Sequence, residues 1–72
     1  MSQNTPINVT LNGERRELPG ATSVAALLER LGVATDLVAV EVNRELVRKR
    51  DFQEHLLGDG DQVEVVEFVG GG

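Results

Sequence analysis

The sequence predicts an α+β fold in which one helix packs on a mixed sheet of four to five strands. Three observations predict it: alternating apolar and polar segments typical of strands, one segment with helical periodicity, and turn residues that separate them. A chain of 72 residues has room for one small domain. We therefore expect a single domain over residues 1–69 and a flexible glycine tail over residues 70–72.

The chain begins with a predicted hairpin. Residues 7–11 alternate apolar and polar side chains, which is the period of a half-buried strand. Asn12-Gly13 then supplies a common two-residue hairpin turn, because both residues tolerate positive φ. A second strand over residues 14–18 runs back beside the first, and Pro19-Gly20 ends it.

A short amphipathic helix follows. Thr22 or Ser23 can cap its first backbone N–H groups, and Gly32 is a good C-terminal stop. Between them one apolar stripe recurs at helical spacing, formed by Val24, Leu27, Leu28 and Leu31. A helix with a single apolar face must cover a sheet.

The remaining predicted elements are shorter. In chain order they are a strand over 38–42, a turn over 43–45, a strand that begins at Leu46, one helical or 3₁₀ turn over 52–57, a loop over 58–61 and a last strand over 63–68.

The last strand does not keep a simple alternation. Val63 and Val65 share one face, whereas Val66 and Phe68 fall on the face of Glu64. A β-bulge after Val65 would return Val66 and Phe68 to the core. A regular strand would leave them exposed as a docking patch for partners, and we favour this second interpretation.

Composition excludes several classes of function. The chain has no cysteine, so it has no disulfide, no cysteine-ligated zinc or iron–sulfur site and no cysteine nucleophile. Its formal net charge of −5 disfavours nucleic-acid binding. No apolar run approaches the length of a membrane span and the first residues do not form a signal peptide, so we expect a cytoplasmic protein without membrane association.

No side chain is a strong candidate for catalysis or metal binding. His55 is expected to face solvent or pack in a short turn. Asp59 and Asp61 flank a glycine in ordinary turn chemistry, with no further oxygen ligands spaced to complete a calcium loop. The basic run 48–50 is followed at once by an acidic residue and is expected to be a solvated turn.

The C-terminal segment, residues 69–72, has the sequence Val-Gly-Gly-Gly. Glycines can enter a narrow channel in another protein and adopt any backbone angle there. Four extended residues reach about 13 Å, which would place a terminal carboxylate inside a partner's active site. A frayed end or a linker remnant is the alternative interpretation.

Several landmarks in combination resemble a known family. They are the Asn12-Gly13 hairpin, the helix TSVAALLERLG, the strand and turn LVAVEVNRELV, the stretch GDGDQVEVVEFV and a terminal Gly-Gly. Together they are similar to the ThiS-type sulfur carriers of thiamine biosynthesis, in the ThiS/MoaD group of the ubiquitin-like β-grasp superfamily. The resemblance covers the chain from about Ile7 to Gly72.

The resemblance implies a protein co-substrate, not an enzyme, with no bound cofactor. A ThiF-type adenylyltransferase, related to ubiquitin-activating enzymes, would use ATP and Mg to adenylate the carboxylate of Gly72. Sulfur derived from cysteine through a desulfurase would then form a thiocarboxylate, which a ThiG-type thiazole synthase consumes. Gly71 and Gly72 are the family's terminal pair, and Gly70 adds one glycine to it.

Three alternatives remain open on sequence. A carrier with the same chemistry could serve molybdopterin or amino-acid biosynthesis. Carriers of the molybdopterin group often have a proline before their terminal glycines, and this chain has none after Pro19, which favours thiamine. A ubiquitin-like protein modifier would share the adenylation step, although Lys49 is the single lysine available for chain formation. The third alternative is a plain β-grasp interaction module whose glycines have no role.

Overall fold

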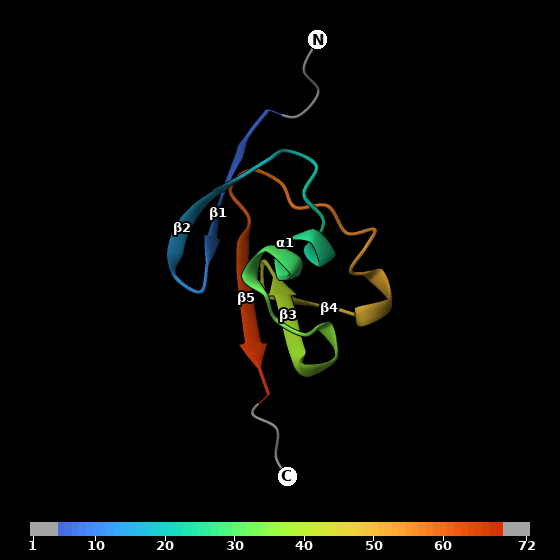
Figure 1. Cartoon of the computed structure of the whole chain (residues 1–72). Coiled ribbons are helices and arrows are strands. Elements are labelled where there is room, and N and C mark those ends of the chain that lie inside the picture. Colours follow the sequence, from blue (N-terminus) through green and yellow to red (C-terminus); the bar gives the residue numbers. More distant parts are fainter. Residues whose placement is uncertain (1–4, 69–72) are drawn as a thin grey trace.

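The computed structural model describes residues 5–68, which form a five-stranded mixed sheet with one α-helix on one face (Figure 1). The strand order is β2-β1-β5-β3-β4. In chain order the elements are β1 (Ile7–Leu11), β2 (Glu14–Leu18), α1 (Val24–Leu31), the 3₁₀ turn η1 (Thr35–Leu37), β3 (Val38–Val42), β4 (Glu45–Val47), the 3₁₀ turn η2 (Lys49–Asp51) and β5 (Gln62–Glu67).

The first hairpin forms as its sequence predicts. β1 and β2 pair antiparallel from Ile7 with Leu18 to Leu11 with Glu14. Asn12 and Gly13 make the two-residue turn with φ values of 49° and 86°. A type I′ turn requires positive φ at both of its central residues, and its twist matches that of the strands it joins.

Helix α1 begins and ends where its capping residues predict. Ser23, not Thr22, is the N-cap: its hydroxyl accepts a hydrogen bond from the Ala26 N–H at 3.0 Å. The Thr22 hydroxyl is buried and donates to the Pro19 carbonyl. Gly32 ends the helix in the left-handed region, with φ 74°. Because α1 has only eight residues, it covers part of the sheet and leaves one end of the inner face uncovered.

The predicted helical turn over 52–57 forms in part and begins earlier than expected. The 3₁₀ turn is Lys49–Asp51, and the Asp51 carbonyl then accepts hydrogen bonds from the Glu54 and His55 N–H groups, so helical bonding ends at His55. The same segment also serves helix α1. The carbonyls of Phe52 and His55 accept hydrogen bonds from the N–H groups of Ala25 and Val24, each at 2.9 Å. These bonds satisfy N–H groups that a helix start leaves without internal partners. The 3₁₀ turn η1 was not predicted.

The second hairpin has a tighter turn than expected. Asn43 and Arg44 make a two-residue turn with φ values of 53° and 72°, so Glu45 belongs to β4 and not to the turn. Positive φ costs an arginine about 1–2 kcal/mol relative to glycine. The tip of this hairpin lies beside the start of β5, because Val42 pairs with Val63.

Strand β5 lies at the centre of the sheet. It runs parallel to β1 and antiparallel to β3 (Figure 1). The inner faces of β1, β3 and β5 pack with α1 in one core, whose fully buried side chains include Val9, Leu27, Leu28, Val40 and Val63. Phe52 is 4% exposed and adds the aromatic member of this core.

Two hairpins, a helix between them and a central fifth strand parallel to the first make this the predicted ubiquitin-like β-grasp fold. No helix within residues 5–68 is long and apolar enough to cross a bilayer.

Candidate functional site

The part of the candidate functional site that the structure describes is the end of β5, from which the C-terminal segment continues. Gly70, Gly71 and Gly72, the predicted tail motif, lie outside the described residues, as does the predicted boundary between domain and tail at residue 69. Within the described residues, the last backbone hydrogen bond after β5 joins the Phe68 N–H to the Leu37 carbonyl at 2.8 Å.

Strand β5 is regular, and the alternative of a bulge after Val65 is wrong. Its pairing with β3 runs without interruption from Val42–Val63 to Val38–Glu67. Val66 and Phe68 are consequently 55% and 56% exposed. The expected exposure is confirmed, and the docking role of these two side chains stays a prediction.

The face of the sheet opposite α1 carries an apolar group that we call the outer patch: Ala39, Leu46, Val66 and Phe68. Val66 pairs directly with Ala39, and Leu46 pairs with Glu41 on the same face. Glu41 also stands directly opposite Glu64 across β3 and β5. Like charges in directly opposed positions repel one another, so this pair favours the approach of a positively charged side chain.

The turn residue Asn12 fastens the first hairpin to β5. The Val65 N–H donates to Asn12 Oδ1 at 2.8 Å, and Asn12 Nδ2 donates to the Val65 carbonyl at 3.1 Å. The carboxamide thus imitates one peptide unit of a neighbouring strand, at a position where β1 has already turned away.

Asn43 has the equivalent role on the other side of β5. The backbone N–H of Asn43 donates to the Gln62 carbonyl at 2.7 Å, and its side-chain Oδ1 accepts from the Gln62 N–H at 3.0 Å. The sequence contained a signal for both contacts, since each two-residue turn begins with asparagine, but turn preference alone explains asparagine there. These contacts fix the direction of the strand that leads into the tail.

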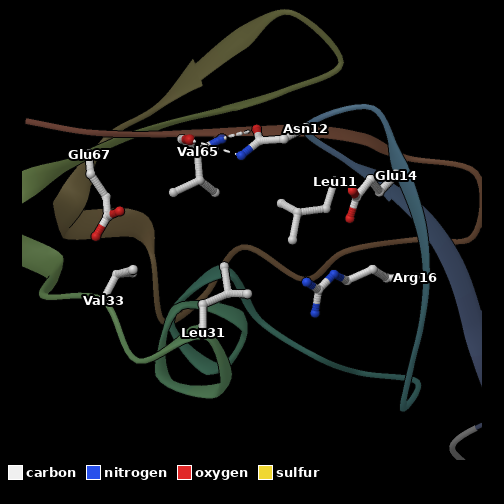
Figure 2. Close-up of a pocket in the computed structure, with 8 residues that line it drawn as sticks. All are labelled: Leu11, Asn12, Glu14, Arg16, Leu31, Val33, Val65 and Glu67. Carbon is white, nitrogen blue, oxygen red and sulfur yellow. Dashed lines mark hydrogen bonds between the residues drawn. The ribbon is translucent and has the colours of Figure 1, made fainter.

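A hollow of about 380 Å³ lies on the inner face, between the end of α1 and the end of β5. Figure 2 shows the side chains that surround it, with Arg16 and Glu14 pointing in from β2 and Glu67 on the far side. The lining residues are Leu11, Asn12, Glu14, Arg16, Leu31, Val33, Val65 and Glu67. It combines apolar walls with a charged rim, and no pattern in the sequence predicted it.

The two aspartates singled out in the loop before β5 have structural partners. Asp59 accepts a hydrogen bond from the Asn8 N–H at 2.8 Å. Asp61 accepts from the Gly58 N–H at 2.8 Å and from Asn43 Nδ2 at 3.0 Å. Both carboxylates therefore organise the loop before β5, in agreement with the turn interpretation.

The basic run 48–50 is exposed, as expected of a solvated turn. Lys49 Nζ lies 2.6 Å from Asp36 Oδ1. The hydrogen bond to Lys49 and the charge of its ammonium group hold the pKa of Asp36 below its ordinary value of 3.8. Both side chains are largely exposed, so the pair adds little to stability.

Known proteins are similar in sequence to this chain along nearly its whole length. The family described as "ThiS family" matches residues 9–72. The sulfur carrier protein ThiS of Thermus thermophilus is 44% identical over 64 residues, which cover 89% of this chain and 98% of that protein. A thiazole synthase of Paramagnetospirillum magneticum is 42% identical over 66 residues, and the chain spans only 20% of the length of that relative.

A solved structure has the same fold. The crystal structure of the thiamine biosynthesis protein ThiS from Geobacter metallireducens superimposes with a TM-score of 0.75 at 39% identity, covering 92% of this chain and all of that one. The family match extends through the terminal glycines, and the fold agrees with it over the described residues. On these grounds the chain belongs to the ThiS family.

Proposed function

We propose that this chain is a sulfur carrier of thiamine biosynthesis, and that the α-carboxylate of Gly72 is the group that carries the sulfur. The observation that supports this most directly is a family match that runs to Gly72 and so includes the glycine tail. In this proposal the chain is a protein co-substrate. Partner enzymes supply the catalytic groups.

The chemistry follows from the low reactivity of a carboxylate. A carboxylate oxygen must become part of a leaving group before a sulfur nucleophile can attack the carbonyl carbon. A ThiF-type adenylyltransferase would join the Gly72 carboxylate to the α-phosphorus of ATP, with release of pyrophosphate, and Mg would neutralise phosphate charge in that enzyme. Persulfide sulfur from a cysteine desulfurase would then displace AMP. A thiol reductant would cleave the sulfur–sulfur bond and leave the thiocarboxylate.

The next partner in the proposal is a ThiG-type thiazole synthase, which would take the sulfur into the thiazole ring. A segment similar to this chain occurs within a relative named thiazole synthase. That occurrence supports a carrier that works next to this enzyme.

The outer patch is the proposed docking surface for the adenylyltransferase. Its exposed side chains Val66 and Phe68 lie at the base of the tail, so a partner that covers them is also placed to receive the tail. The opposed pair Glu41–Glu64 favours a partner with a basic group beside an apolar one. The net charge of −5 favours the same kind of partner through faster encounter.

The absence of cysteine makes a direct test possible. The chain is co-expressed with the ThiF-type enzyme of the same organism, treated with a thiol-alkylating reagent and measured by intact mass spectrometry. Because the sequence holds no thiol, a single adduct on the C-terminal peptide would report a thiocarboxylate at Gly72. The control is the same chain with one alanine appended after Gly72, which should fold equally and accept no sulfur.

Three results would contradict the proposal or its thiamine part. An unmodified chain in the presence of active enzyme, ATP and sulfur donor would favour a modifier or a plain interaction module. Sulfur transfer by the alanine-extended chain without prior trimming would show that the Gly72 carboxylate is not the reactive group. If a thiocarboxylate forms but thiazole synthase does not consume it, the carrier serves another pathway.

A further inference from the structure

The backbone groups of β5 point alternately to its two neighbours. The Phe68 N–H donates to the Leu37 carbonyl, on the side of β3. Val65 bonds through both its N–H and its carbonyl to Asn12, on the side of β1. Alternate residues of a strand direct these groups to the same side, so Glu67 also directs its N–H and carbonyl toward the side of β1.

No strand occupies that side at Glu67 within residues 5–68. The register of β1 with β5 ends at Leu11 and Val63. Asn12 supplies one further partner through its side chain, at Val65, and the chain then turns into β2. Among the described residues, the Glu67 N–H and carbonyl therefore form an open strand edge at the last residue of β5.

The hollow lies next to this open edge. Glu67 and Val65 contribute to its lining from β5, Leu31 from the end of α1 and Val33 from the segment just after it (Figure 2). A strand added beside Glu67 would continue the line of β1, and its inward side chains would enter the hollow. Strand addition takes its affinity from main-chain hydrogen bonds and its specificity from pockets for alternate side chains.

We propose that an extended segment of the adenylyltransferase adds to the sheet as a strand beside Glu67, at the base of the tail. This inference rests on the proposed function and names how the tail is recognised. A segment of Val-Gly-Gly-Gly offers almost nothing except backbone N–H and carbonyl groups. An enzyme that distinguishes this tail must therefore bond its backbone, and Glu67 is the first described residue at which such a ladder can start.

The lining of the hollow specifies the chemistry of the added segment. Its apolar walls, Leu31, Val33 and Val65, are half-buried and suit one aliphatic side chain. The rim carries the carboxylates of Glu14 and Glu67 against the single guanidinium of Arg16. A segment with an aliphatic residue and a neighbouring lysine or arginine complements both features.

Amide hydrogen exchange on the unmodified chain tests the proposal directly. In the free protein, the Glu67 amide should exchange much faster than those of Val66 and Phe68, which face β3. Addition of saturating adenylyltransferase should slow exchange at Glu67 at least about tenfold. An unchanged Glu67 exchange rate in the formed complex would overturn the proposal.

A pair of variants provides an independent test. Glu67→Pro removes the open N–H, and proline is tolerated where the N–H faces away from a paired neighbour. Glu67→Ala removes the same carboxylate and keeps the N–H, so it is the matched control. We expect kcat/KM for adenylation to be about tenfold lower for the proline variant than for the alanine variant, with the same urea midpoint for both.

The outcomes separate this inference from the proposed function. If both variants are adenylated equally well, strand addition at Glu67 is wrong and the carrier function stands. If the unmodified chain is not adenylated at all, the proposed function fails, whatever the variants do. A proline variant with a lowered urea midpoint would leave the exchange experiment to decide.

Discussion

Substitution of Leu28 tests the packing of α1 on the sheet. Leu28 is 0% exposed in the middle of the helix and lies in the core with Val9 and Val40. Leucine-to-alanine changes at such sites cost about 2–5 kcal/mol, and full burial on the helix that covers the core places Leu28→Ala at about 3 kcal/mol. Stability of about 0.05–0.15 kcal/mol per residue gives this domain roughly 4–11 kcal/mol in total. The variant should therefore lose a large fraction of its stability.

Urea unfolding followed by circular dichroism measures this loss. The matched control is Leu56→Ala, the same chemical change at a side chain that is 59% exposed, and it should cost less than about 0.5 kcal/mol. The dependence of unfolding free energy on urea should be unchanged in both variants. Equal losses at Leu28 and Leu56 would refute the assignment of Leu28 to the core.

Three further predictions concern β5 and the surface. Asn12→Gly keeps positive φ but removes both hydrogen bonds to Val65, and should lower the unfolding free energy by about 1–2 kcal/mol. Asn12→Ala should lower it by about 1 kcal/mol more, because alanine is strained at positive φ. Equal losses for the two variants in urea unfolding would argue against that strain. Phe68→Glu should weaken adenylyltransferase binding about tenfold in calorimetry while changing stability by less than about 0.5 kcal/mol; lost stability with intact binding would contradict an exposed docking role. Because Lys49 lowers the pKa of Asp36, the small contribution of this pair to folding stability is present above pH 3.8, the ordinary pKa, and is lost as pH falls through the lowered pKa. Asp36→Asn should therefore make the urea midpoint depend less steeply on pH in acid, and a steeper dependence would contradict the pairing.

Local patterns predicted the elements whose stabilising contacts are close in sequence. The Asn12-Gly13 turn and the alternation on either side of it define a hairpin without reference to the rest of the chain. The helix is equally local, since Ser23, the apolar stripe and Gly32 lie within a few residues of one another. The exposure of Val66 and Phe68 followed from alternation, once a bulge was set aside.

Contacts between distant segments explain what sequence reasoning missed. The segment 52–57 makes local turn bonds to the Asp51 carbonyl, but its carbonyls also bond N–H groups of α1, about thirty positions earlier in the chain. Asn12 and Asn43 reach β5 across more than fifty and about twenty positions respectively. The hollow exists because α1 ends before it covers the inner face. The tail chemistry was recognised from resemblance, and its residues lie outside the described part of the chain.

The central position of β5 has a mechanical consequence. Any partner that draws on the tail pulls this strand along its own axis, and the chain on both sides opposes the movement. Bonds to β1 and Asn12 on one side and to β3 and Asn43 on the other would have to slide together, in shear, rather than open one after another. A domain built this way resists unravelling when its C-terminus is pulled, whereas a tail attached to an edge strand would peel away from its sheet.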